Sequence, residues 1–166
     1  GDIIGIPNHG GIRIGDTFTA GAALQIVGIP RFAPEMMQRA RADDPMKAKH
    51  LSAALEQLAE EGVARIFKPN IDSNWIVGVV GPLQFEVLTD RIRSEYNIPV
   101  KCEQTALYTA RWITSDEPAK LKAFIDGNQS AIANDHDGDP VFLARNAWHL
   151  NDAQDKNPAI KFTATK

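Results

Sequence analysis

The first residues that could do chemistry lie in GVVGPLQF, residues 78–85, where two glycines separate an apolar run from an amphipathic run. A strand, a glycine turn and a helix start in this order are how phosphate-binding loops are built. A Walker loop, however, needs a lysine and a hydroxyl residue after its last glycine, whereas Gly81 is followed by Pro-Leu-Gln. Pro82 also lacks a backbone N–H that could bind an anion, and the three-glycine spacing of dinucleotide sites is missing. The run therefore predicts a structural turn in which Gly81 caps a helix, Pro82 opens it and Gly78 permits close packing.

A second candidate is the acidic run NDHDGDP, residues 134–140, whose composition could suit calcium. An EF-hand loop needs a glycine at position six and a bidentate glutamate at position twelve. Counted from Asp135, the glycine falls at position four, and position twelve is Asn146. The run therefore predicts a solvated turn that joins a helix to a strand.

The histidines and the cysteine show no pattern of a metal centre or a nucleophile. The four histidines, His9, His50, His136 and His149, lie too far apart in the sequence to pair as ligands. Cys102 is the only cysteine, which excludes an intrachain disulfide and a thiolate cluster, and a predicted strand position favours a core or edge residue. We expect no catalytic, cofactor-binding or metal-binding residue in this chain.

The composition is that of a globular protein. Of the 166 residues, 43% are hydrophobic and 23% are charged, and the net charge of −3 means that contact with nucleic acid would need a local basic patch. No apolar run approaches the roughly 20 residues that span a bilayer, and no secretory signal is recognisable. A single cysteine fits a reducing, cytoplasmic compartment. Because the chain begins at Gly1 directly before a strand-like pattern, we interpret it as a piece of a longer protein.

Capping residues and apolar spacing predict two helices. Asp44 as N-cap, Pro45 as first helical residue and Gly62 as stop enclose leucines at 51, 55 and 58. A second helix is predicted from Pro82, and its inner side is expected to carry Leu83, Val87, Leu88 and Ile92. The other predicted elements are strands at 3–6 and 13–18, an edge or irregular strand within 24–42 that Pro30 and Pro34 interrupt, strands at 63–69, 75–80, 98–104 and 107–114, a helix from 115 or 116, a strand at 141–148, a short helix around 151–156 and a strand at 159–164.

Residues 24–104 thus follow the order β-α-β-β-α-β. Two helices on one face of an antiparallel sheet in this order predict an α+β fold with the ferredoxin-like split βαβ arrangement. Residues 105–166 are expected to add a C-terminal αβ extension, so that 24–166 form one domain. Residues 1–23 are expected to form a β-hairpin. Because a lone hairpin is marginal in water, it either comes from a larger, truncated β-domain or packs on the residues that follow.

Several motifs resemble one protein family. The runs KAKHLSAALEQLAEEG and GVVGPLQFEVLTDRIRSEYNIPV resemble the third domain of translational GTPases, and GDIIGIPNHGGIRIGDTFT resembles the closing hairpin of their second domain, a β-barrel. Within that group, GIPRFAPE, LAEEGVARIFKP and TARWI resemble the bacterial peptide-chain release factor three family. The resemblance covers essentially the whole chain.

The resemblance implies a cytoplasmic translation termination factor that binds the ribosome with GTP and Mg²⁺ and promotes dissociation of class I release factors. The family's GTPase domain lies upstream of the matching region, so its nucleotide-binding residues have no positions in this sequence. This piece is therefore expected to be monomeric and catalytically inert, with no cofactor and no membrane partner. It would dock on rRNA and ribosomal proteins and relay a GTPase-dependent domain reorientation.

Basic residues cluster modestly along the chain, and charge alone favours solvated faces. The clusters are Arg39 with Arg41, Lys47 with Lys49, Arg65 with Lys68, and Arg91 with Arg93. Given the resemblance, Lys47, Lys49 and His50 on the first helix and Arg91 and Arg93 on the second are expected to contact the ribosome, although no family motif assigns them individually.

Two other functions compete with ribosome docking. Ferredoxin-like modules often bind metabolites at a sheet edge, so a small-molecule-sensing regulatory module is the alternative. An enzyme is disfavoured, because no acid–base or nucleophile constellation converges in the sequence.

Overall fold

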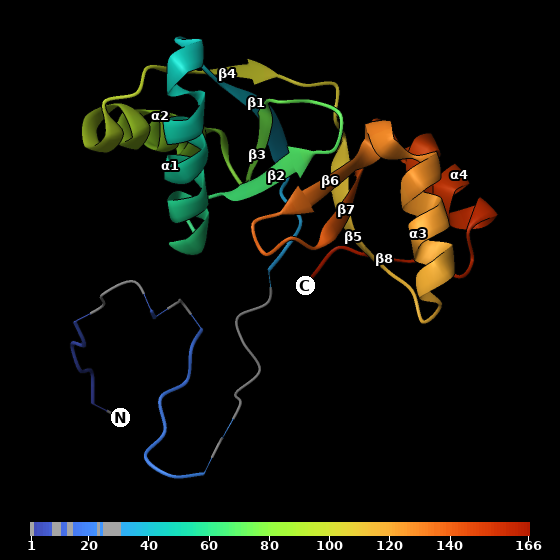
Figure 1. The fold of residues 1–166 in the computed structure, drawn as a ribbon, viewed down its shortest axis with the longest axis horizontal. Coiled ribbons are helices and arrows are strands. Elements are labelled where there is room, and N and C mark those ends of the chain that lie inside the picture. Colours follow the sequence, from blue (N-terminus) through green and yellow to red (C-terminus); the bar gives the residue numbers. More distant parts are fainter. Residues whose placement is uncertain (1, 8–10, 13–14, 23, 25–30) are drawn as a thin grey trace.

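The computed structural model describes residues 2–7, 11–12, 15–22, 24 and 31–166. Residues 31–166 contain one antiparallel sheet in the order β4-β1-β3-β2-β6-β7-β5-β8, with helices at its two ends (Figure 1). This arrangement confirms the predicted α+β class. The strands are β1 (Met36–Ala42), β2 (Arg65–Pro69), β3 (Trp75–Val79), β4 (Val100–Gln104), β5 (Thr109–Thr114), β6 (Ile132–Asp135), β7 (Pro140–Ala144) and β8 (Lys161–Thr163), and the helices are η1 (Pro45–Lys47), α1 (Ala48–Glu60), α2 (Pro82–Tyr96), α3 (Pro118–Gly127), η2 (Gln129–Ala131) and α4 (Ala147–Lys156).

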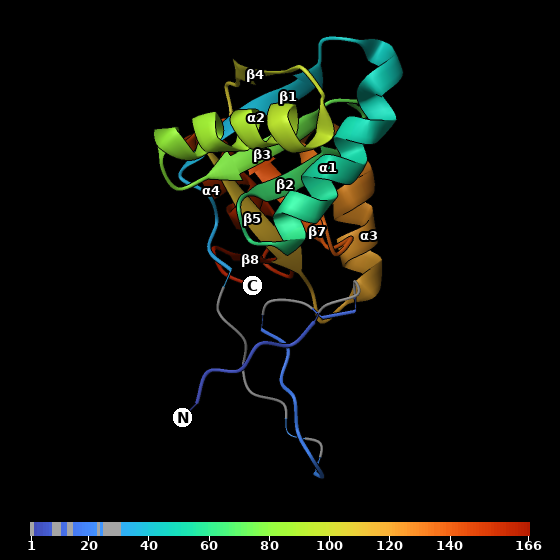
Figure 2. The same cartoon turned by 90° about the vertical axis from the view of Figure 1, so that its left-hand side faces the viewer.

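The first half of the sheet contains the strands β4, β1, β3 and β2 in that order. β3 lies between β1 and β2, and β1 lies between β3 and β4, with antiparallel pairing throughout. α1 and α2 lie on one face of these strands (Figure 2). The predicted succession of strands and helices between residues 36 and 104 is therefore confirmed. Among the described helices, none combines the length and the hydrophobicity that crossing a bilayer requires.

The boundaries of α1 follow from the capping residues that predicted it. Asp44 accepts a hydrogen bond from Met46 N at 2.9 Å, and Pro45 opens the short 3₁₀ turn that leads into the helix. Gly62 ends the helix with a φ of 75°, a left-handed conformation that glycine adopts without strain. Leu55 and Leu58 are fully buried. Burial of such side chains contributes about 1.5–3 kcal/mol each.

The inner side of α2 differs from the predicted one. Phe85, Leu88 and Ile92 are buried, whereas Leu83 is 70% exposed and Val87 is 53% exposed. The sequence offered two apolar stripes on neighbouring sides of the helix, and the stripe that carries the aromatic ring faces the sheet. The prediction was right for Leu88 and Ile92 and wrong for Leu83 and Val87.

β1 is not the edge or irregular strand that the prolines led us to expect. It begins at Met36, after Pro34, and pairs with β3 on one side and β4 on the other. Proline cannot donate to a strand ladder, but it can precede a central strand without breaking any pair. Pro30 lies outside the described residues.

In the part of residues 1–23 that the structure describes, the predicted hairpin strands are not seen. Residues 2–7, 11–12 and 15–22 contain no strand, and Arg13 and Ile14 lie outside the described residues. Ile3 is 101% exposed and Phe18 is 60% exposed, so these segments bury little of their apolar surface. A two-stranded hairpin needs such burial to be stable in water.

Three features of residues 105–166 differ from the prediction. β6 was not predicted, because a strand of four residues with one large apolar side chain gives too short a pattern. β7 ends at Ala144, not at residue 148. α4 begins at Ala147, not near 151, because Asn146 Oδ1 accepts a hydrogen bond from His149 N at 2.7 Å and caps the helix.

The two halves of the sheet pack against each other through the faces that carry no helix. Ile66 belongs to the cluster under α1 and α2, but its neighbour Phe67 points to the opposite face. In the same way Ile113 packs under α3 and α4, while Trp112 belongs to the cluster that contains Phe67. The Phe67 and Trp112 rings meet edge to face at 6.5 Å between centroids. The sheet therefore curves back on itself and buries a third core.

This packing leaves no room for a side chain at position 78, which is occupied by glycine. A Cβ added at this position in β3 would collide with the Pro34 ring and lie 3.3 Å from Phe67 Cε2. The predicted role of Gly78 in close packing is confirmed. Gly127, at the end of α3, has open space around the same position.

We predict that Gly78→Ala lowers the free energy of unfolding by about 1–3 kcal/mol, because the methyl group overpacks a filled site. Gly127→Ala is the matched control, and it should leave stability unchanged or raise it by up to about 1 kcal/mol. Urea unfolding midpoints of the two variants measure the difference. Equal midpoints would contradict the packing role of Gly78.

Candidate functional site

The turn at residues 78–85 satisfies its own backbone donors. Gln84 Oε1 accepts hydrogen bonds from Val80 N at 2.8 Å and from Gly81 N at 3.3 Å. Gln84 N donates in turn to Gly81 O at 3.1 Å. At a phosphate loop, such N–H groups would point at the ligand. Here the Gln84 side chain accepts the hydrogen bonds that a bound phosphate would accept in such a loop.

The predicted contact residue Lys47 has a structural partner. Its Nζ donates to Asn97 O at 2.8 Å, where α2 ends. A lysine in this position satisfies a carbonyl of the last turn and offsets the negative end of the helix dipole. The bond also places the start of α1 beside the end of α2.

Arg91 is likewise engaged within the chain. It donates to Glu95 at 2.7 and 2.9 Å and to Glu61 at 2.9 Å, which joins α2 to the end of α1. The hydrogen bonds to Glu95 and Glu61 raise the pKa of Arg91, and the hydrogen bond from Arg91 lowers the pKa of Glu95. A guanidinium held by two carboxylates offers little charge to a partner.

The other three predicted contact residues are available. Lys49, His50 and Arg93 are exposed, and none of them forms an ion pair with another described residue. Lys49 and His50 lie in the first turn of α1, and Arg93 lies in the last turn of α2. We call these three residues the helix-end surface.

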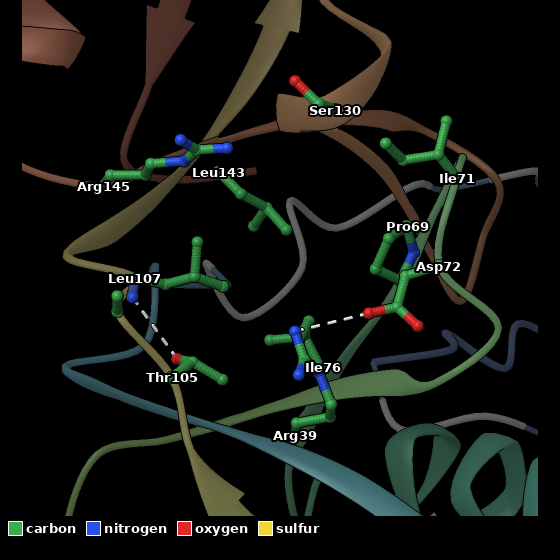
Figure 3. A pocket seen from close by; sticks show the side chains of 11 residues that line it. Arg39, Pro69, Ile71, Asp72, Ile76, Thr105, Leu107, Ser130, Leu143 and Arg145 are labelled. Carbon is green, nitrogen blue, oxygen red and sulfur yellow. Dashed lines mark hydrogen bonds and ion pairs between the residues drawn. The ribbon is translucent and has the colours of Figure 1, made fainter.

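A cleft of about 380 Å³ opens between the two halves of the chain (Figure 3). Its apolar wall includes Ile76 from β3, Leu143 from β7 and Leu107 from the connection between β4 and β5. Arg39 and Arg145 lie on opposite sides of Leu107 and Leu143 (Figure 3). The sequence did not predict this cleft, since its residues come from separate elements and share no spacing. The remaining lining residues are Pro69, Ile71, Asp72, Thr105, Ala106 and Ser130.

The acidic run 134–140 is not the solvated turn between helix and strand that was predicted. It joins β6 to β7, and Asp135 is only 7% exposed. Asp135 Oδ2 accepts hydrogen bonds from Trp112 Nε1 and Lys166 Nζ, both at 2.9 Å. Lys166 also binds Asp137 at 2.8 Å and pairs with Asp139. A buried carboxylate of this kind must be paired, which composition alone could not reveal.

The same cluster contains the described side chains whose geometry comes nearest to a metal site. Ligand atoms of Asp135, His136 and Asp137 lie within 4.8 Å of one another. The Lys166 ammonium already pairs with both carboxylates, and the Arg31 guanidinium lies 3.2 Å from His136 Nε2. The positive charge that a carboxylate pair requires is therefore supplied by the protein.

The ion pairs of this cluster shift its pKa values. Burial acts to raise the pKa of Asp137, but hydrogen bonds from Lys166 and Arg31 and the nearby His136 charge outweigh it and lower the pKa to about 2. The pKa of Asp135 is also lowered, because the bonds from Lys166 and Trp112 outweigh its burial. Burial lowers the pKa of His136 despite the nearby Asp137.

Cys102 in β4 has the properties of a structural residue. Burial raises the pKa of its thiol to about 11. A nucleophilic cysteine needs a lowered pKa, because the thiolate is the reactive form. The thiol packs instead beside the cluster under α1 and α2.

The chain was compared with models of known protein families. The family model described as "Class II release factor RF3, C-terminal domain" matches residues 27–154. The match covers more than half of the chain, and it includes both halves of the sheet up to α4.

We predict that Lys166→Ala weakens the fold in a pH-dependent way. The pKa values of Asp135 and Asp137 lie below the unfolded value of 3.8, so their stabilisation is present above about pH 4 and is lost as the pH falls towards 2. Without Lys166, the free energy of unfolding at pH 7 should fall by about 1–3 kcal/mol, and acid unfolding should begin at higher pH.

Lys161→Ala is the control for this variant, because Lys161 forms an exposed ion pair with Asp116. Such a pair contributes only about 0–1 kcal/mol. Circular dichroism from pH 7 down to pH 2 compares the two variants. A Lys166→Ala difference that is the same at every pH would contradict the linkage.

Proposed function

Because the chain belongs to the class II release factor RF3 C-terminal domain family, we propose that this region docks a translation termination factor on the ribosome. The observation that carries the proposal is the helix-end surface, where Lys49, His50 and Arg93 are exposed without ion-pair partners among the described residues. Cations without ion pairs at the start of α1 and the end of α2 are suited to rRNA phosphates, because their binding releases condensed counterions. Ribosomal proteins at the same place would add further contacts.

In the full-length factor, the docked region would relay the state of a GTPase domain. That domain would bind GTP and Mg²⁺ upstream, and its cycle would reorient this region through different contacts in its two states. The outcome would be dissociation of class I release factors. The region itself would contribute binding and rigidity, since Arg91 and Lys47 join α1 and α2 into one unit.

We also propose that residues 36–104 form the ferredoxin-like split βαβ core, with residues 105–166 as its extension. The strand order β4-β1-β3-β2 and the two helices over one face support this assignment. The connection at 105 is held by Thr105, whose hydroxyl donates to Met37 O at 3.1 Å.

We predict that Lys49→Glu combined with Arg93→Glu, placed in the full-length factor, weakens its binding to ribosomes. Each phosphate contact that is lost should also lower the slope of log K against log salt by about one. Lys47 and Arg91 are left unchanged, because their replacement would disturb the helices they join. Ribosome pelleting across a salt series provides the measurement.

Lys122→Glu is the matched control, since Lys122 is an exposed lysine on α3 that has no ion pair with a described residue. It should bind ribosomes with the affinity and salt slope of the unmodified factor. If the double variant folds normally and retains both values, the helix-end surface is not the contact.

A further inference from the structure

The cleft between the two halves lies apart from the helix-end surface. Its wall residue Ile76 belongs to the face of the sheet that points away from α1 and α2, whereas Trp75 and Val77 on either side of it pack under those helices. A partner in the cleft would therefore touch the sheet from the side opposite to the proposed ribosome contact. The cleft does not depend on the ribosome proposal.

The charges in the cleft are not balanced. Asp72 holds Arg39 in an ion pair of 3.3 Å, and its other oxygen accepts from Asn74 N at 3.0 Å and from Asn74 Nδ2 at 2.9 Å. Arg39 Nε is buried and has no acceptor among the described residues. Arg145 is exposed, and its side chain forms no ion pair with a described residue. The cleft is thus lined by two guanidinium groups and one carboxylate, and the oxygens of that carboxylate are already occupied.

The wall between the two arginines is aliphatic. Ile76, Leu107 and Leu143 line it, and no aromatic ring is among the lining residues (Figure 3). Single-stranded nucleic acid binds through aromatic stacking platforms together with positive charge, and the platforms are missing in this described cleft. An aliphatic wall beside the Arg145 guanidinium, which has no ion pair with a described residue, and the unsatisfied Nε of Arg39 suits a carboxylate that has an aliphatic neighbour.

The rim of the cleft is open. Ile71 at its edge is 68% exposed, and Ser130 and Arg145 are exposed as well. Sites for small molecules usually enclose most of the ligand surface. A cleft with an exposed rim is better suited to a peptide whose chain extends beyond the cleft on both sides than to an enclosed metabolite.

We infer that this cleft binds an acidic peptide segment of a partner protein. One Asp or Glu side chain of the peptide lies between Arg39 and Arg145 and accepts their hydrogen bonds. A neighbouring Leu, Ile or Val side chain covers Leu107 and Leu143. The hydroxyl of Ser130 and the backbone of residues 105–107 are placed to contact the peptide backbone.

The experiment selects peptides from a random display library on the 1–166 chain, with the Arg39→Gln/Arg145→Gln variant as the counter-target. Selection on the unmodified chain should enrich peptides with Asp or Glu next to an aliphatic residue, and selection on the variant should not. A fluorescein-labelled peptide from the enriched set then gives affinities by polarisation. The double variant should bind this peptide at least about tenfold more weakly than the unmodified chain does, since two charge-assisted hydrogen bonds are lost.

Arg41→Gln is the matched control, because Arg41 lies on the same strand, pairs with Glu103 at 2.8 Å and does not line the cleft. It should retain the unmodified affinity, and all variants should keep the same urea midpoint. Enrichment that is absent or the same on the double variant would overturn the inference. So would displacement of the peptide at equal concentration by free glutamate, which indicates a small carboxylate site, or by an oligouridine RNA, which indicates a nucleic-acid site.

Discussion

The apolar contact between the two helix-free faces of the sheet is the interaction on which the other features depend. Pairing of β2 with β6 makes one continuous sheet, and the helices cover only the outer face of each half. The inner faces, with Phe67, Ile76 and Trp112, would otherwise meet water. Their burial against each other sets the curvature of the sheet. That curvature creates the cleft at one place and brings Trp112 to Asp135 at another.

The sequence predicted those parts of the fold whose signals are local. The boundaries of α1 followed from Asp44, Pro45 and Gly62, because caps act within a few residues. The strand β6 was missed, because its four residues give too short a pattern and its pairing with β2 joins positions far apart in the sequence. The central position of β1 was missed for the same reason. Local patterns report propensity, and pairing partners are a property of the whole chain.

The candidate site residues show the same difference between local signals and contacts that are distant in the sequence. Lys49, His50 and Arg93 could be named from the sequence, since exposed charge on a helix follows from its periodicity. The engagement of Lys47 and Arg91 could not be named, because it depends on where Asn97 and Glu61 lie in space. The cleft could not be named at all. The buried Asp135 looked like one member of a solvated acidic run until the position of Lys166 was known.

The backbone ladder between residues 31–33 and 164–166 joins the two ends of the described core. Arg31 and Lys166 exchange two hydrogen bonds of 3.0 Å, and Ala33 N donates to Ala164 O at 2.7 Å. During synthesis the earlier strand of this ladder leaves the ribosome long before its partner does. Closure of such a distant pair is slow, because the loop entropy must be lost before the contact forms. The Asp135 carboxylate and the backbone at Arg31 therefore lack their lysine and their pairing segment until residues 164–166 have emerged.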